Sequence, residues 1–228
     1  MFPPERLDPF EVVEQVAEYR DLWKPNKVRI VLLAESHVRT SPGDFAIQWS
    51  YKTNDSIYAG HYVRFVYCLA NGERELAPIP TNRGTWQYWK LLYHCLNPVS
   101  KARDPPVLKR STPDFHERMR KKIDLLLDLK NAGIWLMDAS IVGIEREKPT
   151  LKAEVLLDCW KNYVGQKLTT MDPRPRGIIV VGNGVRDALE KEILNDLGIQ
   201  PAVIRQPNAH LIGGYSDYQI CFDFCSRL

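Results

Sequence analysis

Four short polar clusters follow apolar runs in this 228-residue chain, and they contain the side-chain types that hydrolytic enzymes use. Carboxylates orient water or stabilise a developing cation, and imidazole, hydroxyl and amide groups donate to a departing anion. Burying Glu35 and His37 unpaired would cost several kcal/mol, so packing alone does not explain the first cluster. The clusters are Glu35-Ser36-His37, Asp138 with Ser140, Gly182-Asn183-Gly184, and Gln206 to His210.

The segments before these clusters predict a parallel β-sheet. Each is an unbroken apolar run, and helical segments separate the runs, which is typical of a sheet covered by helices on both faces. The carboxyl ends of parallel strands meet at one edge, so we expect the clusters to share that edge. We therefore predict an α/β fold: one domain over residues 1–228, with three α/β/α layers and a central, mainly parallel four-stranded sheet.

The remaining segments are predicted from caps, turns and periodicity. Residues 36–60 read as a long polar loop that carries Trp49 and Tyr51, and "HYVRFVYCLANGE" reads as a short strand closed by a turn. The predicted helices are one capped by Asp8 that runs through Leu22, an aromatic one from Thr85, one over 114–131 ended by Gly133, one near 152–163, one after Gly184, and the closing segment.

Composition narrows the function classes. Hydrophobic residues make up 44% of the chain, which is enough for a core, and a net charge of +3 permits an acidic partner without requiring one. The five cysteines form no CxxC pair, so neither a zinc site nor a disulfide framework is indicated. The first residues lack a signal-peptide pattern, and no run is long enough to cross a membrane. We expect a cytoplasmic protein without metal or cofactor.

The order and spacing of several segments resemble a known family. They are "VLLAESHV", "GTWQYWKLLYHCL", "GIWLMDASIVG", "GIIVVGNGVRDAL" and "VIRQPNAHL", which cover about residues 28–225. They are similar to the uracil-DNA glycosylase superfamily, which has a strand leading to a GQDPY-, GEAPG- or GMNPG-like motif, then a strand like GVLLLNTVLTV, and finally HPSP. The resemblance implies a monomeric DNA repair enzyme that flips uracil, or a related deaminated base, out of DNA and hydrolyses its N-glycosidic bond. An abasic site remains, and no metal is needed.

The first motif departs from the family pattern at several positions. Ala34 stands where glycine is common, and Glu35 matches the glutamate of the GEAPG form. Ser36 occupies the place of the water-activating Asp or Asn, and His37 replaces the proline. Main-chain N–H groups of residues 35–37 remain available in principle as donors to the leaving base. The resemblance implies an atypical glycosylase or a relative that has lost the activity.

The later motifs depart as well. Asp138 falls at the Asn that reads the base edge, and Gln206 takes the place of the HPSP histidine, with His210 four residues on. The catalytic candidates are Glu35 and Asp138, either of which can orient water, and His210 or Asn208, either of which can donate to the base. An ionised carboxylate at Asp138 would repel the O4 side of uracil. Asp138 is therefore less suited to reading the base edge and is the better water-orienting candidate.

A flipped base requires an aromatic or polar pocket, and the gap in the DNA requires a wedge. Trp49, thirteen residues after Ser36, is the preferred stacking residue, and Phe45 and Tyr51 are alternatives. The full base-binding prediction is Ser36, His37, Trp49 and Asn208. The DNA-binding prediction is Arg39, Ser41 and Arg83 with Leu211 as the wedge, Ile212 and Tyr215 being the alternative wedges and Thr81 and Asn82 further backbone contacts.

Two other functions remain open from the residues. One is a hydrolase of small nucleosides or nucleotides, which needs no wedge and shows no salt-dependent DNA binding. The other is a non-catalytic DNA- or nucleotide-binding relative, which the missing family Asp and His suggest.

Overall fold

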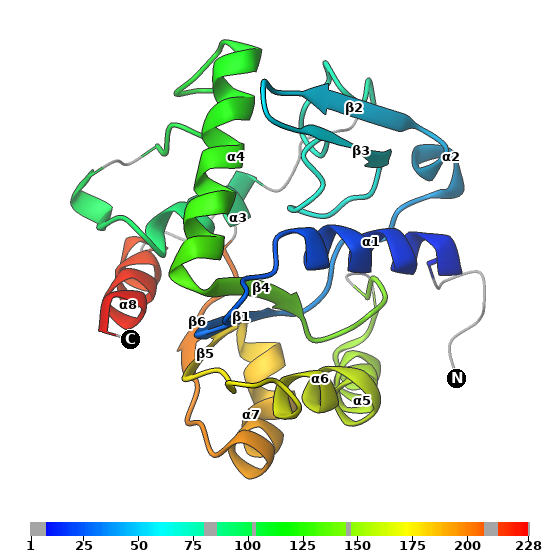
Figure 1. The fold of residues 1–228 in the computed structure, drawn as a ribbon. Helices are drawn as coiled ribbons and strands as arrows, with labels where there is room; N and C mark the ends of the chain where they lie inside the picture. The colour runs from blue at the N-terminus through cyan, green and yellow to red at the C-terminus, as the bar shows by residue number, and fades with distance from the viewer. Residues whose placement is uncertain (1–7, 80–85, 102–103, 145–146, 208–213, 228) are drawn as a thin grey trace.

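The computed structural model describes residues 8–79, 86–101, 104–144, 147–207 and 214–227 (Figure 1). Its centre is a four-stranded sheet with the spatial order β4-β1-β5-β6, and every pairing in that sheet is parallel. The predicted three-layer α/β/α architecture is confirmed. The four strands are β1 (Ile30–Ala34), β4 (Ile134–Asp138), β5 (Gly177–Val181) and β6 (Ala202–Ile204).

Helices cover both faces of the sheet. In Figure 1, α1 and α4 lie above the sheet, and α5, α6 and α7 lie below it. No helix in the described part of the chain has the length and apolar character needed to cross a membrane. The helical elements are α1 (Phe10–Leu22), α2 (Pro42–Phe45), α3 (Trp86–His94), η2 (Val99–Lys101), α4 (Phe115–Ala132), α5 (Pro149–Cys159), the π-helical turn η3 (Trp160–Val164), α6 (Gly165–Thr169), α7 (Asn183–Leu197) and α8 (Gly214–Arg227).

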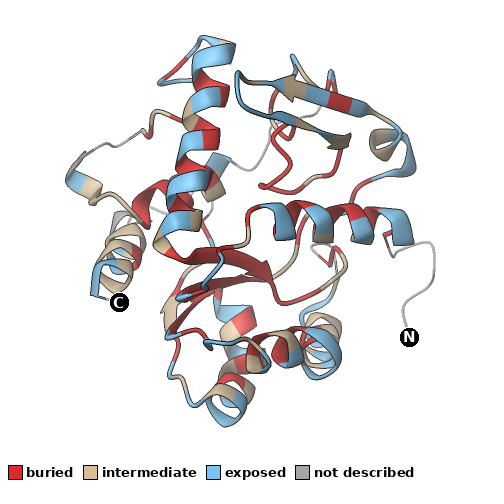
Figure 2. Ribbon diagram, in the orientation of Figure 1, coloured by how far each residue is buried: buried red, intermediate tan, exposed pale blue. Residues whose placement is uncertain are grey.

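The core lies on the three long strands and the helices packed against them. Every residue of β1, β4 and β5 is buried, and Figure 2 shows these strands in the red of buried residues. This explains why the strands read as continuous apolar runs, because helices cover both faces and neither face meets water.

The long helix α4 shows how local sequence sets element boundaries. Asp114 caps its first turn by accepting a hydrogen bond from the Glu117 N–H at 2.7 Å. Gly133 ends it with φ of 76°, a left-handed conformation, and a Cβ at Gly133 would come within 2.8 Å of the Lys27 carbonyl. Both boundaries agree with the sequence prediction.

The prediction of a polar loop over residues 36–60 is wrong. This segment contains α2 and an antiparallel hairpin formed by β2 (Gln48–Lys52) and β3 (Ile57–His61). The hairpin turns at Asn54-Asp55, and Thr53 donates its main-chain N–H to the Ser56 carbonyl at 2.8 Å. The strands are short and mostly polar because one face is solvated, so their apolar signal is weak.

Two other local predictions are also corrected. The described residues 62–79 contain no strand: they form buried turns, because Val63, Phe65 and Leu69 point into the core without a neighbouring strand to pair with. Asp8 does not cap α1, whose N-cap is Pro9 and has no side-chain cap bond. The Asp8 carboxylate is used elsewhere, at the carboxyl edge of the sheet.

Candidate functional site

The strand pairing brings the first two polar clusters together. β1 and β4 are neighbours in register, with Ala34 opposite Asp138. Beyond the strands, the chains stay paired for two more residues, because Ala139 donates its N–H to the Ala34 carbonyl at 2.7 Å and Ser140 donates to the Glu35 carbonyl at 2.9 Å. The predicted meeting of these clusters at the carboxyl edge is confirmed.

A buried ion-pair network, formed by Asp8, Arg20, His37 and Asp138, lies at this edge. The Arg20 Nη2 donates to Oδ2 of Asp138 at 2.8 Å, and the two ring nitrogens of His37 face one carboxylate each. Nε2 of His37 lies 3.2 Å from Oδ2 of Asp8, and Nδ1 lies 3.5 Å from Oδ2 of Asp138. All four residues are buried, so the two carboxylates are balanced by two cations away from bulk water.

The charges of this network shift the pKa values of its members. Burial alone lowers the pKa of His37, but the contacts with Asp138 and Asp8 outweigh burial and raise it to about 8. Burial raises the pKa of Asp8, yet His37 and the main-chain N–H groups of Gly143 and Thr40 outweigh it, so the Asp8 pKa is lowered. The raised pKa favours the protonated form of His37 at neutral pH. In this form Nε2–H donates to Asp8, while Nδ1 lies 3.5 Å from Asp138 and has no hydrogen-bond partner among the described residues.

Short loops hold the network in place. Oδ2 of Asp8 accepts the Gly143 N–H at 2.7 Å, and Oδ1 accepts the Thr40 N–H at 3.1 Å. A Cβ at Gly143 would lie 2.7 Å from the Arg39 main-chain nitrogen, so only glycine allows these two loops to approach. The hydroxyl of Ser36 accepts the Ile144 N–H at 3.3 Å, which ties the first cluster to the same loop.

A second set of polar groups, which we call the Glu35 rim, lies beside this network. Glu35 accepts a hydrogen bond from the Lys152 ammonium of α5 at 2.7 Å, and both side chains keep some contact with solvent. Tyr88 of α3 is half-buried, and its hydroxyl interacts with Gln206 after β6. Burial raises the pKa of Tyr88, and the negative charges of Asp138 and Glu35 raise it further, so Tyr88 is a neutral donor.

The two candidate carboxylates have different surroundings. Asp138 is 3% exposed and bonded to Arg20, so water reaches it poorly. The Glu35 side chain is 14% exposed and has one cationic partner. Glu35 is therefore more accessible to water than Asp138, whereas the sequence alone pointed to Asp138 as the water-orienting candidate. The reason is the Arg20 side chain, which α1 brings to Asp138 from 118 residues away.

The predicted base-stacking residue Trp49 lies in the core. It is 6% exposed in β2, and its indole N–H donates to the Tyr19 hydroxyl at 2.9 Å. The alternatives are also engaged: Phe45 stacks on His61 at 4.7 Å between ring centroids, and the Tyr51 hydroxyl donates to the His116 carbonyl at 3.4 Å. The structure does not bring Trp49 to the Glu35 rim, because its side chain faces inward from the hairpin.

Trp49→Phe is expected to lower the free energy of unfolding by about 1–2 kcal/mol, because the Tyr19 hydroxyl loses its donor inside the core. Urea denaturation measures this change, with Tyr51→Phe as the control, since Tyr51 makes only a long, exposed bond. A cost for Trp49→Phe no larger than that for Tyr51→Phe would show that the indole N–H contributes little to the core.

The remaining predicted residues are divided between the surface and the parts outside the described residues. Arg39 is exposed, and the Ser41 hydroxyl caps α2 by accepting the Asp44 N–H at 3.1 Å. Gly182, with φ of 107°, makes the turn from β5 into α7. The predicted Arg83, Asn208, His210 and Leu211 lie outside the described residues, as do Thr81, Asn82 and Ile212.

Sequence reasoning missed several partners at this edge: Arg20, Tyr88 and Lys152, and Asp8 in its actual role. Arg20 and Tyr88 sit within amphipathic helical segments, where they read as ordinary surface or core positions. These residues come close to a polar strand end only in the folded structure, so no pattern along the chain marks them. Among the described residues, no group of three or more His, Cys, Asp or Glu side chains is arranged to hold a metal ion.

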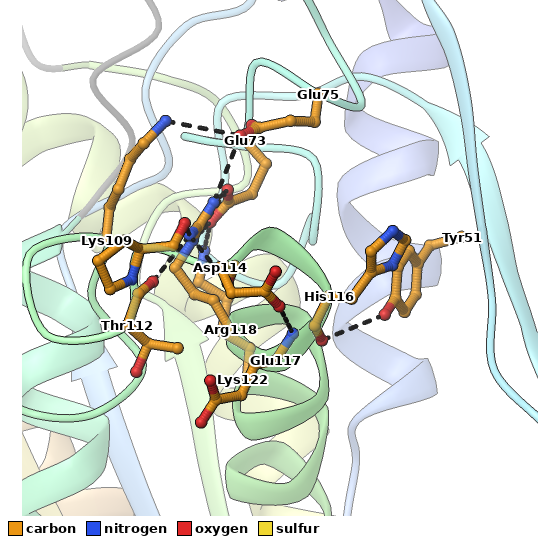
Figure 3. A network of polar contacts seen from close by, with 11 residues as sticks. Tyr51, Glu73, Glu75, Lys109, Thr112, Asp114, His116, Glu117, Arg118 and Lys122 are labelled. Carbon is orange, nitrogen blue, oxygen red and sulfur yellow. Dashed lines mark hydrogen bonds and ion pairs between the residues drawn. The ribbon is translucent and has the colours of Figure 1, made fainter.

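A separate buried charge cluster, formed by Glu73, Arg118 and Lys122, lies against α4 (Figure 3). The Arg118 guanidinium binds the Glu73 carboxylate through Nε and Nη2, the shortest contact being 2.6 Å, and Nη1 donates to the carbonyls of Thr112 and Pro113 at 2.8 Å. The Lys122 ammonium lies 2.6 Å from Glu73 and above the Trp89 ring. Because these polar groups are closed off by one another, we assign them a structural role.

Comparison with known proteins finds no family model, no curated protein and no solved structure that matches this chain.

Proposed function

We propose that this protein is a DNA glycosylase that removes uracil, or a related deaminated base, by hydrolysing its N-glycosidic bond. The observation that carries the proposal is the Glu35 rim, where a partly exposed carboxylate, a lysine ammonium and a neutral tyrosine hydroxyl gather at the carboxyl edge of a parallel sheet. This edge is where open α/β sheets bind ligands. The sequence resemblance to the uracil-DNA glycosylase superfamily supports the same reaction.

In the proposed reaction, the Glu35 carboxylate acts at the sugar. Cleavage of the bond between the sugar carbon and the base nitrogen develops positive charge on the sugar and negative charge on the base. The Glu35 carboxylate stabilises the sugar cation and orients the attacking water, whose oxygen bonds to the sugar carbon. Lys152 fixes the position of the Glu35 carboxylate through a hydrogen bond of 2.7 Å.

The negative charge that develops on the leaving base requires hydrogen-bond donors. The Tyr88 hydroxyl is neutral and next to Gln206, so both can donate to an oxygen of the leaving base. The buried ion-pair network behind them contributes a fixed and overall neutral support, because its two cations and two carboxylates are paired. Asp138 thus serves to hold this support in place rather than to contact the base.

Glu35→Gln is expected to slow base excision about 10²-fold or more, because the amide keeps the shape and loses the charge that stabilises the sugar cation. The measurement is single-turnover cleavage of labelled duplexes containing uracil, hypoxanthine, xanthine or a T:G mismatch, followed by alkali. DNA affinity, measured separately, should be largely kept. Glu154→Gln is the matched control, since Glu154 is exposed on α5, the helix that carries Lys152.

Each alternative function has its own outcome in this experiment. Cleavage of free nucleosides without cleavage of any duplex indicates a small-molecule hydrolase. Salt-dependent DNA binding without cleavage by the parental protein indicates a binding relative. If Glu35→Gln excises at the parental rate, the water-orienting group lies elsewhere.

A further inference from the structure

We propose that a pocket between α1 and the η3–α6 segment binds a small, neutral aromatic molecule that carries an amide or lactam carbonyl, with Arg20 as its hydrogen-bond donor. This goes beyond the proposed glycosylase activity and concerns a different space, at the outer edge of strand β4. We call it the α1–α6 pocket. Its volume is about 800 Å³, within the usual range for sites that take drug-sized ligands.

Much of the wall of the α1–α6 pocket is apolar, and the polar side chains of Asn162, Gln166, Lys167 and Thr170 line the rest. Val13 and Ala17 of α1 form one wall, and Val164 with the loop residues Ile141 and Val142 forms much of the rest. Phe10 and Tyr163 also line the pocket, and both are well exposed, at 70% and 57%. Tyr163 belongs to the π-helical turn, a feature that occurs often at functional sites. Flat apolar ligands suit such walls because aromatic faces stack on aromatic side chains.

The polar floor contains a donor that lacks an acceptor. Arg20 is 7% exposed and lines the pocket, where its Nη2 is bonded to Asp138. Its Nε is buried and has no hydrogen-bond partner among the described residues. The Arg20 side chain keeps 9% exposure and lines the pocket, so a ligand that brings an acceptor oxygen to its guanidinium gains a hydrogen bond there.

The charge balance of the floor selects a neutral acceptor. The cations Arg20 and His37 are matched by the carboxylates of Asp8 and Asp138. The Lys167 ammonium, which also lines the pocket, is paired with Asp21 at 3.1 Å, so each of these charges already has a partner. A charged ligand would lose hydration on entering this partly closed space without gaining a free counterion. A carbonyl oxygen on a flat ring meets both requirements, and this defines the class as aromatic amides and lactams.

The test uses benzamide as the probe and the full-length protein. Protein-observed NMR titration should give saturable shifts at the amides of Val13, Ala17 and Val142. Benzylammonium and benzoate, which keep the ring and carry a charge, should bind at least about tenfold more weakly. Ala17→Leu fills the pocket and should weaken benzamide binding by a similar factor. Glu14→Leu, at an exposed position of the same helix outside the pocket, should leave it unchanged.

A second variant keeps the test decisive if Ala17→Leu does not fold. Tyr163→Ala removes a largely exposed side chain, so it should fold and should weaken benzamide binding. The proposal is overturned if benzamide produces no saturable shifts, if the charged analogues bind equally well, or if Tyr163→Ala binds like the parent. None of these readouts depends on base excision, so the glycosylase proposal stands or falls separately.

Discussion

Glu73→Gln is expected to lower the free energy of unfolding by about 3–5 kcal/mol, the largest effect that we predict for this protein. Glu73 is 2% exposed and accepts from Arg118 and Lys122, which are also buried. The substitution keeps the shape of the side chain and removes the one carboxylate among the described residues that contacts both cations at less than 3 Å. Two buried cations then lose their common counterion, and urea denaturation at neutral pH measures the loss.

Two further variants control this experiment. Glu117→Gln removes a half-exposed carboxylate from α4, the helix that carries Arg118 and Lys122. Its ion pair with Lys121 is solvated, so stability should change by less than about 1 kcal/mol. Adding Lys122→Met to Glu73→Gln removes one of the uncompensated cations and should restore part of the lost stability. A cost for Glu73→Gln no larger than that for Glu117→Gln would show that water reaches the cluster.

The second large effect is a dependence of stability on pH that comes from His37. Its pKa is raised from 6.5 to about 8 in the folded protein, because the contacts with Asp138 and Asp8 outweigh burial. Protonation of His37 therefore stabilises the fold fully below pH 6.5, and this contribution is lost as the pH rises through 8. The shift corresponds to about 2 kcal/mol between pH 6 and pH 9.

The comparison with His37→Gln isolates this effect. Burial lowers the pKa of His94, so that residue contributes with the opposite sign and destabilises the fold as the pH falls below 6.5. The difference in unfolding free energy between parent and variant cancels His94 and should shrink as the pH rises from 6 to 9. A difference that stays constant over this range would mean that folding does not raise the pKa of His37.

The sequence by itself determined the fold class and much of the site's location. Apolar strand runs and helix caps act over a few residues, so patterns around β1, β4, β5 and α4 predict those elements directly. Parallel strands then require their polar carboxyl ends to meet, which predicts that Glu35 lies near Asp138, as it does in the structure. The hairpin escaped this reasoning because its half-solvated strands carry little apolar signal.

Only the tertiary structure decided which charged groups are paired and which remain accessible. A sequence does not distinguish a buried, paired carboxylate from a solvated one, because contacts between distant segments determine which charged groups pair. Arg20 reaches Asp138 across 118 residues, and Lys152 reaches Glu35 across 117. Those two contacts close off Asp138 and leave Glu35 open to solvent. Trp49 lies in the core for a similar reason. Its side chain is on the inward face of the hairpin and contacts Tyr19 of α1, and this contact depends on how α1 packs against β2 and not on residue type.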